Sequence, residues 1–396
     1  MSSYTSLLQT PFDSISPEDE GFIDELLGVA ELFRPFSAAM DEFLLEQGFS
    51  GDILDIDAKT GFISGAFERS AMKPPRELRL WFSEDQPIER DTAFQLCFAF
   101  GLDGTKTDEF FRHVLVGERS FDCHRVQEAI WYFCLNNGLT WADAQDILSR
   151  IPSPEGSEEE TTVVYTGSIL RELNRIGDRN ELIRYLTDNV SHFNTNNATA
   201  YQMIRNRWND LSRKGGWLER EYDRFLPLSK DPLSGGSGIL KTGPEGVRLW
   251  DAYLAIFQLD KKQVSRLAAD RSIRPILDRF HLAVGDSFPD RQGISLILQG
   301  KHVSYKRVRK WLILLLFYIW WVRRALDRSG YTAEGPDPER FLAFANKALT
   351  DAGYPELYIG DPYDWLFLYI SQDLEPLRLF REVFNSLLGE KLEEHP

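Results

Sequence analysis

The same short unit occurs twice in this 396-residue chain, as residues 90–114 and 127–151, with an offset of 37 positions. In each copy an apolar run that contains a cysteine leads into a Gly-Leu pair, at Gly101 and again at Gly138. A polar residue and an amphipathic segment follow, with apolar residues three and four positions apart. This pattern predicts a helix, a glycine turn and a second helix. Because one such αα-hairpin cannot bury its apolar face alone, we expect the two copies to pack together as a helical repeat.

The cysteines indicate buried packing in a reducing compartment. Cys97 and Cys134 occupy equivalent positions of the two copies, where a small buried hydrophobe is expected. Cys123 is followed by His124, without further residues at the spacing of zinc ligands. Three cysteines cannot form a disulfide framework. We therefore expect no metal and no other cofactor, and because the first residues lack a signal-peptide pattern, we expect a cytoplasmic protein.

The remaining sequence predicts a mainly α-helical fold, in which a helical bundle accompanies the repeat. Trp311 to Val322 is the most apolar stretch. Its twelve residues are too few to cross a bilayer, which takes about 20, so it predicts a helix buried on all faces and no membrane association. One exception stands out at residues 53–65, where isoleucines and a phenylalanine flank a polar turn at 58–61. That segment predicts a small β-hairpin.

Shifts in composition predict how the chain is divided. Residues 1–151 form an N-terminal helical domain that contains the tandem unit. Proline, serine and glutamate dominate residues 152–162, which predict an acidic linker before a helical segment at 163–226. Glycine, proline and serine are frequent in residues 227–246, which predict a flexible loop. A C-terminal helical domain at 247–396 completes the chain.

Charge is distributed unevenly along the sequence. The net charge of −16 argues against a nucleic-acid coat protein. Residues 1–60 contain thirteen acids and two bases, whereas residues 301–328 contain eight bases and one acid. This asymmetry predicts either a basic binding surface or an acidic segment that docks on a basic one.

The basic segment 301–310 supplies the candidate binding residues. These are Lys301, Tyr305, Lys306, Arg307, Arg309 and Lys310. Lysines and arginines around an aromatic ring can hold the phosphates of a nucleic acid through salt-dependent contacts. Two alternatives remain open: the segment could accept the acidic N-terminal region, or it could form the solvated first turns ahead of the buried helix.

The first copy of the tandem unit also resembles a known family. Residues 87–103, which read PIERDTAFQLCFAFGLD, resemble the later helices of repressor-type helix-turn-helix regulators of bacteria and their mobile elements. Over the whole chain the resemblance spans residues 76–151 and 349–366, and it implies a mobile-element or phage-defence context. The helix after each glycine carries acids that would repel phosphates. We therefore expect the repeat to act as scaffold or to bind protein, with direct reading of DNA as the alternative.

Together these observations predict a non-enzymatic regulatory or interaction protein. Its partner would be a protein or a nucleic acid, bound through the 301–310 segment and the surface of the repeat. The alternative is an enzyme. Arg274 and His281, with six residues between them, match the spacing of HEPN-type ribonucleases, in which an arginine and a histidine on one helix act on the RNA 2′-hydroxyl and phosphate.

Overall fold

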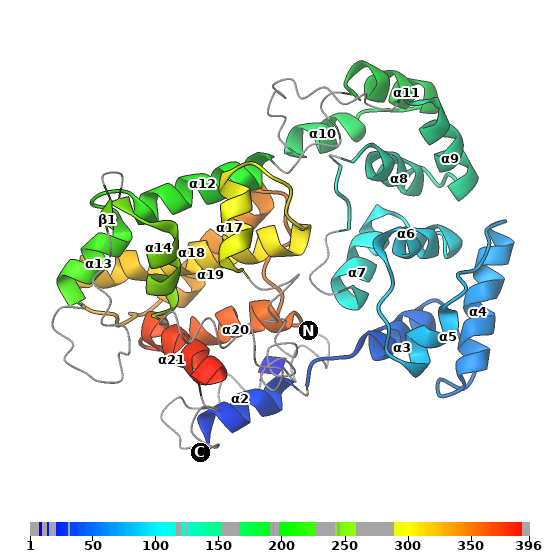
Figure 1. The fold of residues 1–396 in the computed structure, drawn as a ribbon. Helices are drawn as coiled ribbons and strands as arrows, with labels where there is room; N and C mark the ends of the chain where they lie inside the picture. Colours follow the sequence, from blue (N-terminus) through cyan, green and yellow to red (C-terminus); the bar gives the residue numbers. More distant parts are fainter. Residues whose placement is uncertain are drawn as a thin grey trace. The chain divides into compact units, whose positions relative to one another are not determined.

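A computed structural model describes most of the chain. The described residues are 8–9, 14–15, 21–30, 32–115, 120–123, 125–152, 166–190, 193, 198–225, 242–243, 246–258 and 289–389. Over these residues the protein is mainly α-helical, as predicted (Figure 1). The strands found there are β1 (Thr242–Gly243) and β2 (Gly246–Val247), which pair antiparallel. Arg274, His281, almost all of the predicted acidic linker and most of the predicted 227–246 loop lie outside the described residues.

The chain forms two compact units. Arg34–Thr199 makes up one, here called the middle unit. Met1–Phe33 and Ala200–Pro396 together make up the other, here called the split unit. Each unit has a hydrophobic core of its own. This division differs from the boundaries expected from composition, because the predicted 163–226 segment is shared between the two units.

The middle unit consists of short helices around a core rich in aromatic rings. Phe94 lies at its centre, with ring centroids 4.6 Å from Trp131 and 4.9 Å from Phe111. The helices are α3 (Phe36–Glu46), α4 (Ile56–Arg69), α5 (Leu78–Ser83), α6 (Arg90–Ala99), α7 (Gly104–Val114), α8 (Val126–Asn136), α9 (Trp141–Arg150), α10 (Thr166–Leu173) and α11 (Arg179–Asp188).

Both copies of the tandem unit have the same local geometry. Gly101 and Gly138 each have a φ of 63°, the left-handed conformation that glycine adopts at little cost. In each copy the leucine after the glycine donates its N–H to the carbonyl of the cysteine five residues earlier, at 3.0 Å and 2.9 Å. Asp103 then caps α7, and Thr140 caps α9. Each copy therefore forms the predicted helix, glycine turn and helix.

The two cysteines of the tandem unit are packing residues. Cys97 and Cys134 are both fully buried. Burial raises the pKa of the Cys97 thiol and raises the pKa of Cys134 to about 12. Thiols with such raised pKa values stay protonated near neutral pH and react poorly as nucleophiles. Both side chains thus have the packing role that the sequence predicts.

The β-hairpin predicted at residues 53–65 is wrong, because α4 occupies this segment. Asp55 begins the helix, since its carboxylate accepts hydrogen bonds from two backbone N–H groups of the first turn at 2.9 and 3.1 Å. Ile63 and Phe67 are fully buried and lie one turn apart on the same face. The apolar residues that resembled two strands therefore form the inner face of one helix.

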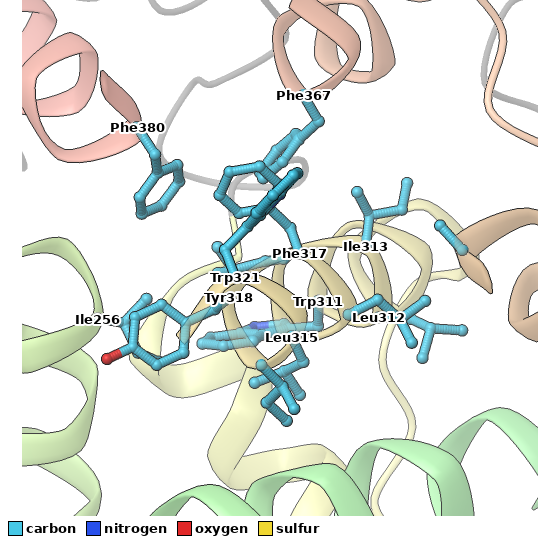
Figure 2. Packing of buried hydrophobic residues seen from close by; sticks show 14 of the residues in the cluster. Ile256, Trp311, Leu312, Ile313, Leu315, Phe317, Tyr318, Trp321, Phe367 and Phe380 are labelled. Carbon is cyan, nitrogen blue, oxygen red and sulfur yellow. The ribbon is translucent and has the colours of Figure 1, made fainter. Parts of the chain in front are cut away.

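The split unit is built around one long helix, α18 (Tyr305–Arg328, 24 residues). Sixteen of its residues are buried. Figure 2 shows its side chains projecting in several directions, toward Ile256, Phe367 and Phe380 of neighbouring helices. The surrounding helices are α2 (Phe22–Ala30), α12 (Ala198–Ser212), α13 (Trp217–Phe225), α14 (Leu249–Phe257), α17 (Arg291–Leu298), α19 (Asp337–Asp351), α20 (Pro362–Ile370) and α21 (Pro376–Gly389).

The core position of α18 confirms the interpretation of its apolar stretch. Trp311 to Ile319 are all at most 5% exposed. Among the helices of the described residues, none combines the length and the apolar character that a membrane crossing requires.

Candidate functional site

The structure divides the predicted binding residues into two groups. Arg309 and Lys310 turn into the core and are 3% and 5% exposed. Lys301 and Lys306 are exposed at the surface, whereas Tyr305 and Arg307 are half-buried. The start of α18 therefore has an inward face, with Arg309 and Lys310, that packs in the core, and an outward face that can contact a partner.

Arg309 is held in the interior by Asp364 of α20. Its guanidinium makes two parallel contacts with the carboxylate, Nη1 to Oδ1 and Nη2 to Oδ2, each at 2.7 Å. It also donates to the carbonyls of Pro355 and Glu356 at 3.4 and 3.3 Å. Burial raises the pKa of Asp364 to about 6, while the charge of Arg309 acts in the opposite direction. Arg309 thus joins α18 to α20 and cannot reach a ligand.

Lys310 is also a core residue. Its Nζ lies 4.9 Å from the ring centroid of Tyr363, whose hydroxyl donates to the Lys310 carbonyl at 3.0 Å. Burial lowers the pKa of Lys310 to about 7, an effect that the nearby Asp361 opposes. The sequence placed Arg309 and Lys310 among the binding residues, and their burial removes both from that set.

The first turn of α18 has an uncompensated positive end. Ser304, the residue before the helix, makes no capping hydrogen bond with its side chain, and the first turn contains no acidic residue. Backbone N–H groups and the helix dipole at such an end attract anions. Lys306 and Arg307 add two cations to the same turn. The Arg307 side chain lies against α17, where a Cβ on Gly293 would be 2.7 Å from its Cδ.

Helix α12 brings another cation to this place. The hydroxyl of Tyr201 donates to the carbonyl of Lys301 at 3.0 Å and accepts from the N–H of Val303 at 2.9 Å. These two bonds hold the loop between α17 and α18 against α12. One turn further along α12, an Nη atom of Arg205 lies so close to Gly300 that a Cβ there would be 2.8 Å away. Arg205 therefore lies beside the backbone that carries Lys301.

We call Arg205, Lys301, Lys306 and Arg307 the anion surface. Within the described part of the chain, neither Arg205 nor Lys301 forms a salt bridge with a carboxylate. Cations gathered on one surface raise the local positive potential, which favours the binding of an anion. Arg205 was not predicted as a site residue, because it lies 96 positions before Lys301 in the sequence and only the folding of α12 brings the two together.

The acidic N-terminal region has contacts elsewhere. Trp365 of α20 donates its indole N–H to the carbonyl of Leu8 at 2.9 Å, and the hydroxyl of Tyr369 donates to the carbonyl of Ile15 at 3.0 Å. At Leu8 and Ile15 the N-terminal region therefore contacts aromatic side chains of α20. In the described residues, no group of three or more His, Cys, Asp or Glu side chains could hold a metal ion.

Comparisons with protein-family models, with curated proteins and with solved structures found no match to this chain.

Proposed function

We propose that the protein is a non-enzymatic nucleic-acid-binding protein that holds phosphate groups on its anion surface. The observation that carries this proposal is that Arg205 lies beside Gly300, the residue before Lys301, a few positions ahead of the uncapped start of α18. Neither Arg205 nor Lys301 has a carboxylate partner among the described residues. The resemblance to repressor-type regulators supports a regulatory role in a bacterial mobile-element or phage-defence context.

The donors on this surface are of the kinds that bind phosphate groups. Backbone N–H groups at a helix start, lysine and arginine are the donors that recur at phosphate oxygens. Four such contacts with duplex DNA would make the logarithm of the binding constant fall with the logarithm of salt concentration at a slope of about −3.6. Affinity would then drop roughly 10²-fold between about 50 and 200 mM salt.

In this proposal the tandem αα-unit is a repeat that serves as scaffold. The acids after its glycines already have structural partners. Asp103 accepts from the N–H of Lys106 at 2.8 Å, and Asp143 lies within salt-bridge distance of Arg179. Hydrogen bonds from Thr140 lower the pKa of Asp143 and so keep it ionised. These acids stabilise helix starts.

Fluorescence anisotropy with a short labelled duplex DNA tests the proposal. Arg205→Gln, Lys301→Gln and Lys306→Gln together should reduce the salt slope by about 3, because each loses one phosphate contact. Arg378→Gln is the matched control, since this arginine is exposed on α21 and pairs with Glu375 and Glu382. A triple variant that binds duplex DNA with the unchanged slope would contradict the proposal, as would a wild-type protein that binds only acidic peptides.

A further inference from the structure

Helix α12 presents a row of amide side chains to solvent. Its inner face packs into the split-unit core through Tyr201, Ile204, Trp208 and Leu211, which are at most 6% exposed. Gln202, Asn206 and Asn209 lie on the opposite face and are exposed. The Gln202 Nε2 donates to the Asn206 Oδ1 at 2.8 Å, so two of the amides support each other.

Two arginines stand on the two flanks of this row. Arg205 and Arg207 are about 200° apart around the helix, since each residue of an α-helix turns by about 100°. Arg205 lies beside Gly300, as described above. Arg207 stacks over the ring of Phe344 in α19, with its guanidinium carbon 5.4 Å from the ring centroid. Phe344 in turn stacks on Trp320 of α18, at 5.1 Å between centroids.

The charge of α12 differs from that of the helices after the glycine turns. Within the described residues, neither Arg205 nor Arg207 forms a salt bridge with a carboxylate. Asp210 is the acid within this helix, and it lies 4.0 Å from Arg213. The outer face of α12 therefore carries neutral hydrogen-bonding groups, and two arginines without a salt bridge among the described residues flank it.

We infer that α12 enters the major groove of B-form duplex DNA and reads base edges with Gln202, Asn206 and Asn209. This inference rests on the proposed function and names its ligand more closely. The major groove is about 12 Å wide and admits an α-helix, which is about 10–12 Å across with its side chains. Asparagine and glutamine amides match the donor and acceptor pair that adenine presents in that groove.

The flanking cations fit the two walls of the groove. A helix lying in the groove has one DNA strand on each side, so Arg205 and Arg207 would each face the phosphates of a different strand. Lys301 extends the contact on the side of Arg205. An A-form RNA duplex has a deep and narrow major groove that does not admit a helix, so the fit is specific to B-form DNA.

Selection from a library of duplex DNA with a randomised centre, using the full chain, tests this inference. The wild-type protein should enrich a short motif with adenines, because amides read that base. Gln202→Ala and Asn206→Ala should each flatten the preference at one or two positions, lowering affinity for the motif by about 5- to 100-fold while leaving the salt slope unchanged. Gln372→Ala, at an exposed amide outside α12, should keep the motif.

The variant Arg207→Ala tests the proposed phosphate contact of α12 separately from base recognition by the amides. It should weaken binding to all sequences alike and reduce the salt slope by about 1. Circular dichroism and thermal unfolding of each variant establish that the overall fold and stability are retained. Enrichment of no motif, or equal affinity for duplex DNA, single strands and duplex RNA in wild type and amide variants, would overturn the inference and leave phosphate binding in place. Absence of binding to every nucleic acid would overturn the proposed function with it.

Discussion

The split unit contains buried cations, such as Arg381, and the cations of the anion surface, such as Arg205, and the two differ in their surroundings. Arg381 of α21 is 5% exposed and makes a two-pronged salt bridge with Glu221 of α13, at 2.9 and 3.0 Å. Tyr318 and Tyr331 donate their hydroxyls to the same carboxylate. Arg205 of the anion surface has no such carboxylate among the described residues. The charge of Arg381 is buried and paired, so it stabilises the fold, whereas the charge of Arg205 is available to a partner.

Breaking the buried network of Glu221, Arg381, Tyr318 and Tyr331 should have the largest effect on stability. Glu221→Leu leaves Arg381 buried without a counter-charge, and we expect the free energy of unfolding to fall by about 3–5 kcal/mol. The double variant Glu221→Leu/Arg381→Met should recover most of this loss, because neither charge of the pair then remains buried. Urea denaturation measures both. A loss below about 1 kcal/mol in the single variant would show that the two groups of cations do not differ as proposed.

Lys310 should make stability depend on pH. Burial lowers its pKa to about 7 in the folded protein, whereas lysine in an unfolded chain titrates near 10.4. Between these values the unfolded chain binds the proton and the folded protein does not, so the free energy of unfolding rises with pH. From about pH 7 to about pH 9 we expect a rise of roughly 2 kcal/mol relative to Lys310→Met, measured by urea denaturation. Parallel pH profiles for the two proteins would contradict this.

A side-chain cap at the start of α18 should raise the stability of the protein and weaken its binding to duplex DNA. Ser304→Asp supplies a carboxylate to the first turn, which lacks a side-chain cap, and should raise the free energy of unfolding by about 0.5–1 kcal/mol. The same carboxylate occupies the N–H groups that we propose for phosphate, so affinity for duplex DNA should fall. Thermal unfolding and anisotropy measure the two effects. A stabilised variant with full affinity would place the phosphate site elsewhere.

Neutralising the anion surface should affect stability least. Arg205→Gln removes a half-buried cation without breaking a salt bridge among the described residues, so we expect a change below about 0.5 kcal/mol. Binding to duplex DNA should nevertheless weaken, with the salt slope reduced by about 1. If Arg205→Gln destabilised the protein as strongly as Glu221→Leu, Arg205 would belong with the buried network.

Local signals in the sequence were sufficient for much of the fold. The glycines at 101 and 138 and the polar residues after them act within a single turn, so the helix, glycine turn and helix of each copy could be predicted. The apolar run from Trp311 to Val322 likewise predicted a buried helix. At residues 53–65 the same reasoning failed, because apolar residues on both sides of a polar centre suit a hairpin as well as one helix face. The cap at Asp55 distinguishes the two.

The candidate site was predicted only in part. Lys301 and Lys306 lie at the surface as expected, but Arg309 and Lys310, three and four residues beyond Lys306, are buried against α20. Their burial depends on Asp364, which is 55 residues away from Arg309 in the sequence. Arg205 was missed for the same reason, since its neighbours in the fold are distant in the chain.

The sequence by itself determined the helical class, the turns of the tandem unit and the presence of a basic segment, because each depends on residues a few positions apart. Only the tertiary structure decided which of those basic residues stay at the surface and which α12 side chains join them. The physical reason is that burial and pairing, which commit a charge to the fold or leave it for a partner, come from contacts between segments far apart along the chain.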